Sequence, residues 1–165
     1  MTISVGDPFP SETVKTWDDA PVDLAVGDLI AGKTAVIFGV PGAFTPTCSM
    51  RHMPGFVDRY DDIKAKGVDV IAVHSVNDPY VMNMWNKDQG HEGIVTLADW
   101  DARLAKALGV DADMSKTGLG LRAARYAAIV RDGKVTYFEV GNLEVSGAEA
   151  ILEALDQGRS SQADG

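Results

Sequence analysis

Cysteine is almost absent from this sequence, since Cys48 is the only one among 165 residues. One cysteine cannot form an intramolecular disulfide, which excludes a small secreted scaffold held together by disulfides. Two motifs of fixed spacing are excluded as well. A Cys-x-x-Cys redox pair would need cysteine where the chain has Arg51, and a Cys-x5-Arg phosphate loop would need arginine where it has Pro54. Chemistry at this thiol must therefore use other residue types as partners.

Long apolar runs, excess positive charge and clustered histidines are also lacking. No apolar stretch approaches the roughly 20 residues that a membrane span requires. The net charge of −9 argues against nucleic acid or an anionic membrane as a partner. One cysteine and three widely spaced histidines offer no closed metal site, and no Gly-rich phosphate-binding motif follows a predicted strand. We therefore expect neither a metal nor a cofactor.

The two ends of the sequence resemble no targeting segment. The opening MTISVGDPFP lacks the basic and apolar regions of a secretory signal, so we expect a cytoplasmic protein. The final residues are small and polar, and we expect 159–165 to form a flexible C-terminal tail. The remaining length, 1–158, suits a single domain.

The first half of the chain predicts alternating strands and helices. Residues 33–40 and 68–76 are apolar runs rich in β-branched side chains, which is typical of buried strands. A helix is predicted between them at 46–66. A second helix is predicted to begin at Pro79, with Asp78 as its N-cap.

The second half predicts an antiparallel hairpin and a final helix. A short strand and a short helix are expected within residues 93–110. Residues 125–140 form two apolar runs around an Asp-Gly pair, the strongest short hairpin signal. Ser146 and Glu149 suggest a capping box that opens a helix ending before Gly158. The order of the main elements, β-α-β-α-β-β-α, predicts an α/β, thioredoxin-like fold with a central mixed sheet flanked by helices.

Cys48 lies where the first of these strands gives way to a helix. In open α/β sheets, ligands bind at the carboxyl ends of the strands. With Thr45 as N-cap and Pro46 at the first helical position, the Thr45 hydroxyl can accept a hydrogen bond from the Cys48 N–H. A helix terminus supplies only about 0.3–1 kcal/mol, less than the roughly 1.4 kcal/mol that lowers a pKa by one. A reactive thiolate therefore needs a full positive charge nearby, for which arginine is best suited.

Three arginines are candidates for that charge. Arg125 adjoins a strand that is apolar on both faces, where a charge needs a partner. Arg131 borders an exposed turn about 20 Å away along the same strand, so the two cannot serve one sulfur. Arg51 lies one helical turn beyond Cys48. We favour Arg125, with Arg51 as the alternative.

Other interpretations of the thiol stay open at this point. A lone cysteine in a globular protein is commonly a small buried hydrophobic residue. A Cys/His hydrolase would use His52, His74 or His91, although His52 needs an orienting group of its own.

Three blocks of the sequence resemble one family. Pro41, Thr45 and Cys48 form the Pro-x-x-x-Thr-x-x-Cys signature of peroxiredoxins, within GVPGAFTPTCSMRHMPGF. That block, SVNDPYVMNMW and GLGLRAARYAAIVRDGKV are similar to the type II, or peroxiredoxin-five-like, subgroup. The resemblance extends over residues 3–155.

The resemblance implies a thiol-dependent peroxidase that reduces hydrogen peroxide and small alkyl hydroperoxides. Cys48 would be the peroxidatic nucleophile that becomes a sulfenic acid. Thr45 would hydrogen-bond thiolate and peroxide, Pro41 would shield the sulfur, and Arg125 would be the active-site arginine. Relatives of this type are commonly homodimers.

One feature departs from some relatives, because this chain has no second, resolving cysteine. An external thiol must then complete the cycle. We favour glutathione with glutaredoxin, since a small thiol can enter a narrow pocket, and thioredoxin is the alternative. A redox sensor that forms mixed disulfides is the competing function. Phe44, Trp85 and Leu119 are candidates for an apolar pocket wall that would suit organic peroxides.

Overall fold

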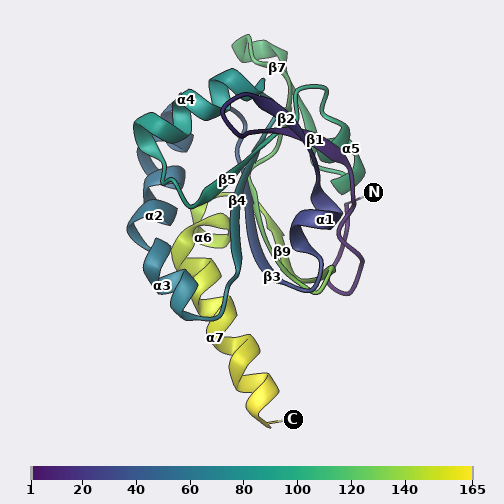
Figure 1. The fold of residues 1–165 in the computed structure, drawn as a ribbon, viewed down its shortest axis with the longest axis vertical. Coiled ribbons are helices and arrows are strands. Elements are labelled where there is room, and N and C mark those ends of the chain that lie inside the picture. Colours follow the sequence, from purple (N-terminus) through teal and green to yellow (C-terminus); the bar gives the residue numbers. More distant parts are fainter. Residues whose placement is uncertain (1, 165) are drawn as a thin grey trace.

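The computed structural model describes residues 2–164, except for the side chains of Cys48 and of residues 158–164. At its centre lies a seven-stranded mixed sheet of order β2-β1-β5-β4-β3-β8-β9 (Figure 1). Its strands are β1 (Thr13–Trp17), β2 (Pro21–Ala25), β3 (Thr34–Gly39), β4 (Val70–Ser75), β5 (Ile94–Ala98), β8 (Tyr126–Arg131) and β9 (Lys134–Val140). A separate two-stranded ladder joins β6 (Asp111–Met114) to β7 (Gly120–Ala123).

Helices cover both faces of the large sheet. They are α1 (Val26–Ile30), α2 (Met53–Asp58), α3 (Tyr60–Ala65), α4 (Pro79–Gln89), α5 (Arg103–Leu108), α6 (Leu143–Ser146) and α7 (Ala148–Asp164), with a π-helical segment at Cys48–His52 and a 3-10 turn at Ser115–Thr117. One core contains buried residues of α1 and α5, and the other contains those of α2, α3, α4 and α7 (Figure 1). Because β3, β4 and β8 are buried on both faces, their sequences are mostly apolar and do not alternate between apolar and polar residues.

Strand pairing sets which ends of the strands meet. β3, β4 and β5 are parallel to one another, and β5 was not placed in the sheet by the sequence. β8 runs antiparallel to β3 and forms the predicted hairpin with β9. The turn residues Asp132 and Gly133 both have positive φ, the conformation that a tight two-residue hairpin turn requires. The carboxyl end of β3 therefore lies beside the carboxyl end of β4 and the beginning of β8.

The predicted helix over 46–66 is interrupted twice. Its first part widens into the π-helical segment at Cys48–His52, and Arg59 separates α2 from α3. Pro54 explains the wide turn, because it has no N–H to donate and its ring would collide with the carbonyl four residues earlier. Such π-helical turns occur often at functional sites.

The capping box predicted for the last helix is wrong. Ser146 is the final residue of α6, and its buried hydroxyl donates to the Gly141 and Asn142 carbonyls. The last helix, α7, begins at Ala148 and continues through Gly158 to Asp164, since one glycine costs a helix only about 1 kcal/mol. The predicted flexible tail stays a prediction, and residue 165 lies outside the described residues.

The N-terminal hairpin β1–β2 was not predicted. It extends the sheet beyond β5 through a short antiparallel contact. In the described part of the chain, no helix is both long enough and apolar enough to cross a membrane.

Candidate active site

The site lies at the carboxyl end of β3. Gly39, the last residue of this strand, pairs with His74 on β4 and Tyr126 on β8. A Cβ atom on Gly39 would lie 2.0 Å from a ring carbon of Tyr126, so glycine is required for the ring to pack there. Arg125 immediately precedes Tyr126, and the same strand register therefore carries Arg125 to this edge of the sheet.

The loop from Pro41 to Thr45 leads from β3 to the helix that carries Cys48. The Thr45 hydroxyl donates to the Gly42 carbonyl at 2.6 Å, and the Ser49 N–H donates to the Thr45 carbonyl at 2.9 Å. The first helical residue is therefore Pro46, directly after Thr45, as predicted. The hydrogen bond predicted from the Cys48 backbone N–H to the Thr45 hydroxyl stays a prediction, and the side chain of Cys48 lies outside the described part of the structure.

Phe44 gives this loop its strained backbone. Its φ is 64°, a left-handed conformation that an aromatic residue rarely adopts. Such residues cost about 1–3 kcal/mol and persist where the surroundings fix them. The loop is therefore held in place by contacts outside it.

Arg125 is held by a buried histidine. Nη1 of Arg125 donates to Nδ1 of His52 at 2.8 Å, and Nε2 of His52 lies 2.8 Å from the Ser146 carbonyl. Because guanidinium can only donate, Nδ1 is the acceptor and the proton of the neutral ring lies on Nε2. Burial beside Phe38 and Phe56, together with the positive charge of Arg125, lowers the pKa of His52 to about 4. His52 thus orients Arg125, and it is not placed to act as a base.

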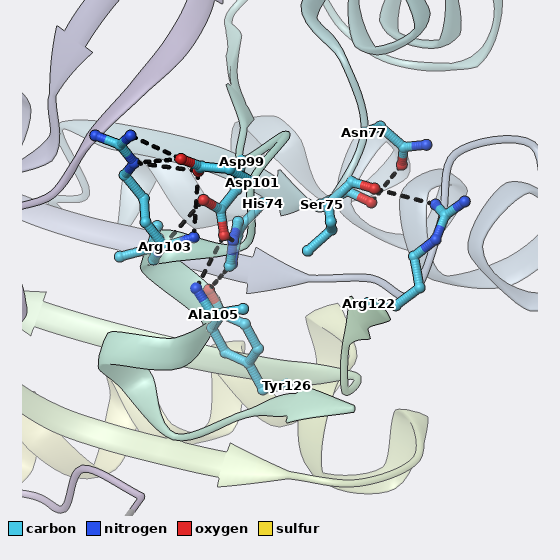
Figure 2. Close-up of polar contacts among 11 residues, drawn as sticks. His74, Ser75, Asn77, Asp99, Asp101, Arg103, Ala105, Arg122 and Tyr126 are labelled. Atoms are coloured by element: carbon cyan, nitrogen blue, oxygen red, sulfur yellow. Dashed lines mark hydrogen bonds and ion pairs between the residues drawn. The ribbon is translucent and has the colours of Figure 1, made fainter. Parts of the chain in front are cut away.

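The other two histidines also have partners of their own. His74, near the carboxyl end of β4, forms hydrogen bonds with the Tyr126 hydroxyl and the Asp99 carboxylate (Figure 2). Burial acts to raise the pKa of Asp99, but the hydrogen bond from His74 and others outweigh it and lower that pKa. His91 stacks on Tyr60. A Cys/His hydrolase therefore has no support in this arrangement.

Arg125 and Arg51, the favoured arginine and its alternative, line one cavity of about 390 Å³. Its walls are formed by Thr47, Arg51, Arg125, Asn142, Leu143 and Glu144. A second cavity of about 340 Å³ adjoins it, since Arg51 and Leu143 line both. Arg131 pairs with Thr34 at the other end of β8, so it lies away from this edge, as predicted.

The cavity beside Arg125 lacks the expected apolar wall, because its lining includes none of Phe44, Trp85 and Leu119. Trp85 is fully buried in the core, where its Nε1–H donates to Ser49 and Gln89, so that part of the prediction is wrong. Phe44 is about half exposed. The cavity beside Arg125 is lined mainly by charged and polar side chains.

Three further residues at this edge were missed from the sequence. Arg122 donates to backbone carbonyls, and Asn77 accepts from Ser75 and from the Ala43 N–H (Figure 2). All three lie within the sequence blocks that resemble type II peroxiredoxins. No spacing rule distinguishes them from their neighbours, because Arg122 and Asn77 bind backbone groups elsewhere in the chain and Ser75 in turn binds Asn77.

Comparison with known proteins matches this architecture. A model of the Redoxin family matches residues 4–152. The chain belongs to this family. It is 45% identical to Peroxiredoxin-2C of Oryza sativa subsp. japonica, over 93% of this chain and 98% of the relative. The crystal structure of reduced Prx3 in complex with H2O2 from Vibrio vulnificus shares 46% identity and a TM-score of 0.91, over 96% of this chain and 99% of that one. Peroxiredoxin 5 from Alvinella pompejana shares 32% identity and a TM-score of 0.84, over 94% and 99% of the two chains.

These likenesses confirm the resemblance to type II peroxiredoxins and the thioredoxin-like fold. The redoxin described here is a single-cysteine member with thiol-dependent peroxidase activity. Some relatives are named as chloroplastic or mitochondrial proteins.

Proposed function

We propose that Cys48 is the peroxidatic nucleophile and reduces hydrogen peroxide and small alkyl hydroperoxides, with Thr45, Arg125 and Pro41 completing the site. The observation that carries the proposal is the fixed guanidinium of Arg125. Neutral His52 holds it at a cavity that Thr47, the neighbour of Cys48, also lines. A fixed positive charge there favours thiolate over thiol and stabilises charge that moves along the breaking O–O bond.

The reaction follows from ordinary thiol chemistry. The Cys48 thiolate attacks one peroxide oxygen, the O–O bond breaks, and the departing oxygen takes up a proton to leave as water or an alcohol. The sulfur, oxidised by two electrons, becomes a sulfenic acid. The Thr45 hydroxyl already donates to the Gly42 carbonyl, so its oxygen lone pairs remain available to accept from the peroxide hydroxyl. Pro41, at the start of the loop, shields the sulfur from water.

Stopped-flow tryptophan fluorescence and intact mass with limiting hydrogen peroxide test this assignment. Hydrogen bonds to charged groups contribute about 1.5–3 kcal/mol, so Arg125→Ala should slow oxidation about 10- to 100-fold. Arg131→Ala, at the other end of the same strand, is the matched control and should react like the parent. Cys48→Ser should consume no peroxide. Oxidation of the parent no faster than that of free cysteine would show that Cys48 is only a structural thiol.

For the reductant we propose glutathione, assisted by glutaredoxin, with thioredoxin as the alternative. The support is the charge of the cavity beside Arg125. Arg51 and Glu144 line it and could pair with the carboxylate and ammonium groups of a small zwitterionic thiol. Its volume of about 390 Å³ lies within the range of small-molecule sites. The sulfenic acid and glutathione would give a mixed disulfide and water, and a second glutathione would release the Cys48 thiol and glutathione disulfide.

Steady-state turnover separates these reductants. Glutathione alone, glutathione with glutaredoxin, and thioredoxin with its reductase are compared at one peroxide concentration. Arg51→Gln should raise the KM for glutathione while leaving the rate of Cys48 oxidation unchanged. If only the thioredoxin system supports turnover, the glutathione assignment is ruled out. If no thiol supports turnover, a redox sensor is favoured.

We also propose a homodimer and a cytoplasmic location. Phe44 and Leu121 are large apolar side chains that are 51% and 42% exposed, and they belong to two segments that the bond from Arg122 to the Pro41 carbonyl joins. A second copy of the chain would cover them. Analytical ultracentrifugation tests the dimer, and a monomer at micromolar concentration would contradict it. Fractionation of the source cells tests the location.

A further inference from the structure

We infer that Arg122 and Asn77 are positioning residues, which clamp the loop Pro41–Thr45 and so set the approach of peroxide to Cys48. The inference rests on the proposed role of Cys48. Neither side chain lines the cavity beside Arg125. Both act on the backbone of the loop.

Arg122 binds this edge of the sheet from one side. Its Nη1 donates to the Val76 carbonyl at 3.1 Å and to the Pro41 carbonyl at 3.4 Å, and its Nε donates to the Leu119 carbonyl at 2.8 Å. These carbonyls belong to the segment after β4, the loop after β3 and the turn before β7. One half-buried guanidinium thus ties three segments together, and its planar fork is suited to several acceptors at once.

Asn77 binds a second point of the same loop. Its Oδ1 accepts from the Ala43 N–H at 3.0 Å and from the Ser75 hydroxyl at 2.6 Å. Figure 2 shows Ser75 and Asn77 beside Arg122 at the end of β4. The Ser75 hydroxyl holds the Asn77 side chain in the rotamer that reaches Ala43. The Pro41 carbonyl and the Ala43 N–H are therefore fixed independently.

Gly42 lies between these two anchors and contacts both Arg122 and Thr45. A Cβ atom at Gly42 would lie 3.0 Å from Nη1 of Arg122 and 3.1 Å from Cγ2 of Thr45. The guanidinium is thus packed directly against the residue whose carbonyl accepts from the Thr45 hydroxyl. Displacing Arg122 would move Gly42, and with it the Thr45 hydroxyl that is proposed to orient the peroxide.

The clamp predicts a specific kinetic defect. Arg125 and His52 are anchored through β8 and Ser146, so the charge that favours the Cys48 thiolate stays in place when the clamp is removed. What changes is the position of Thr45 and Pro41. A displacement of about 1 Å can cost about 100-fold in a reaction that depends on orientation. Loss of the clamp should therefore slow the reaction with peroxide far more than the reaction of the thiolate with a simple alkylating agent.

The experiment measures both reactions on Arg122→Met and Asn77→Ala. Stopped-flow fluorescence gives the rate constant with hydrogen peroxide. Alkylation by iodoacetamide as a function of pH gives the thiolate reactivity and the pKa of Cys48. We expect the peroxide rate constant to fall about 10- to 100-fold, with alkylation within about two-fold of the parent. Arg103→Met, which removes an exposed guanidinium bound to Asp101, is the matched control and should change neither rate.

The outcomes are distinct. Equal losses in both reactions, with unchanged circular dichroism and melting temperature, would overturn the inference, because the residues would then act on the thiolate itself. Unchanged peroxide rates would overturn it as well. Asn77→Ala decides the question if Arg122→Met does not fold. A parent protein that reacts no faster than free cysteine would instead refute the proposed role of Cys48, before any variant is compared.

Discussion

The contact between buried His52 and half-buried Arg125 gives the folded protein a defined sensitivity to acid. His52 is 1% exposed and neutral, with a pKa lowered from 6.5 to about 4 by burial and by the charge of Arg125. Below about pH 6.5 the unfolded chain binds a proton at this histidine, while the folded protein binds it only near pH 4. Stability is therefore lost as the pH falls through this window.

The magnitude follows from the two pKa values. A difference of one in pKa is equivalent to about 1.4 kcal/mol, so lowering the pKa of His52 from 6.5 to about 4 removes about 3 kcal/mol of unfolding free energy between pH 7 and pH 4. Other groups titrate in the same range. His52→Gln, which cannot titrate, isolates the contribution. Its unfolding free energy should change by about 3 kcal/mol less than that of the parent over this interval.

Urea unfolding at half-unit steps of pH measures the effect, and NMR titration of the His52 ring measures its pKa directly. If the two stability curves run parallel between pH 7 and pH 4, the burial argument is wrong. A His52 pKa near 6.5 in the folded protein would also show that the burial argument is wrong. It would also remove the reason for treating the ring as a fixed, neutral acceptor for Arg125.

Two further changes probe the packing beneath the site. Gly39→Ala should lower the unfolding free energy by about 1–3 kcal/mol, because the new Cβ would meet the Tyr126 ring at 2.0 Å. Gly55→Ala, where a Cβ has room, is the control, and equal melting temperatures for the two variants would contradict the argument. Tyr126→Phe should cost about 1–3 kcal/mol in denaturant unfolding, since Nδ1 of buried His74 loses its partner. Tyr80→Phe, at an exposed position, should change stability by less than about 0.5 kcal/mol. A cost at Tyr126 no larger than at Tyr80 would argue that the His74 bond contributes nothing.

Local sequence was sufficient for features that depend on neighbouring residues. The Asp78 side chain accepts from the Val81 N–H, and Pro79 opens α4, because an N-cap satisfies donors only three residues away. The Asp132–Gly133 turn follows from the backbone preferences of two residues. The position of Cys48 after a buried strand followed in the same way from the apolar run of β3.

Local sequence failed where a residue is used by a distant part of the chain. Ser146 has the features of an N-cap, yet its hydroxyl closes α6 and its carbonyl binds His52. Met84 and Trp85 are adjacent on α4, but Met84 is 57% exposed and Trp85 is fully buried. Which side of an amphipathic helix is covered depends on the sheet beneath it, and that sheet is assembled from distant strands.

The sequence by itself determined the candidate reactive residue, the candidate residues around it on its own loop and the order of the main strands and helices. Tertiary structure alone decided how Arg125 is held and what fixes the loop. His52 and Arg125 are 73 positions apart, and Arg122 is 81 positions from the Pro41 carbonyl. Those contacts exist because the register of β3 against β4 and β8 brings three strand ends to one edge of the sheet. Register between these distant strands is not readable from their sequences, because strands that are buried on both faces carry no alternating pattern to specify it.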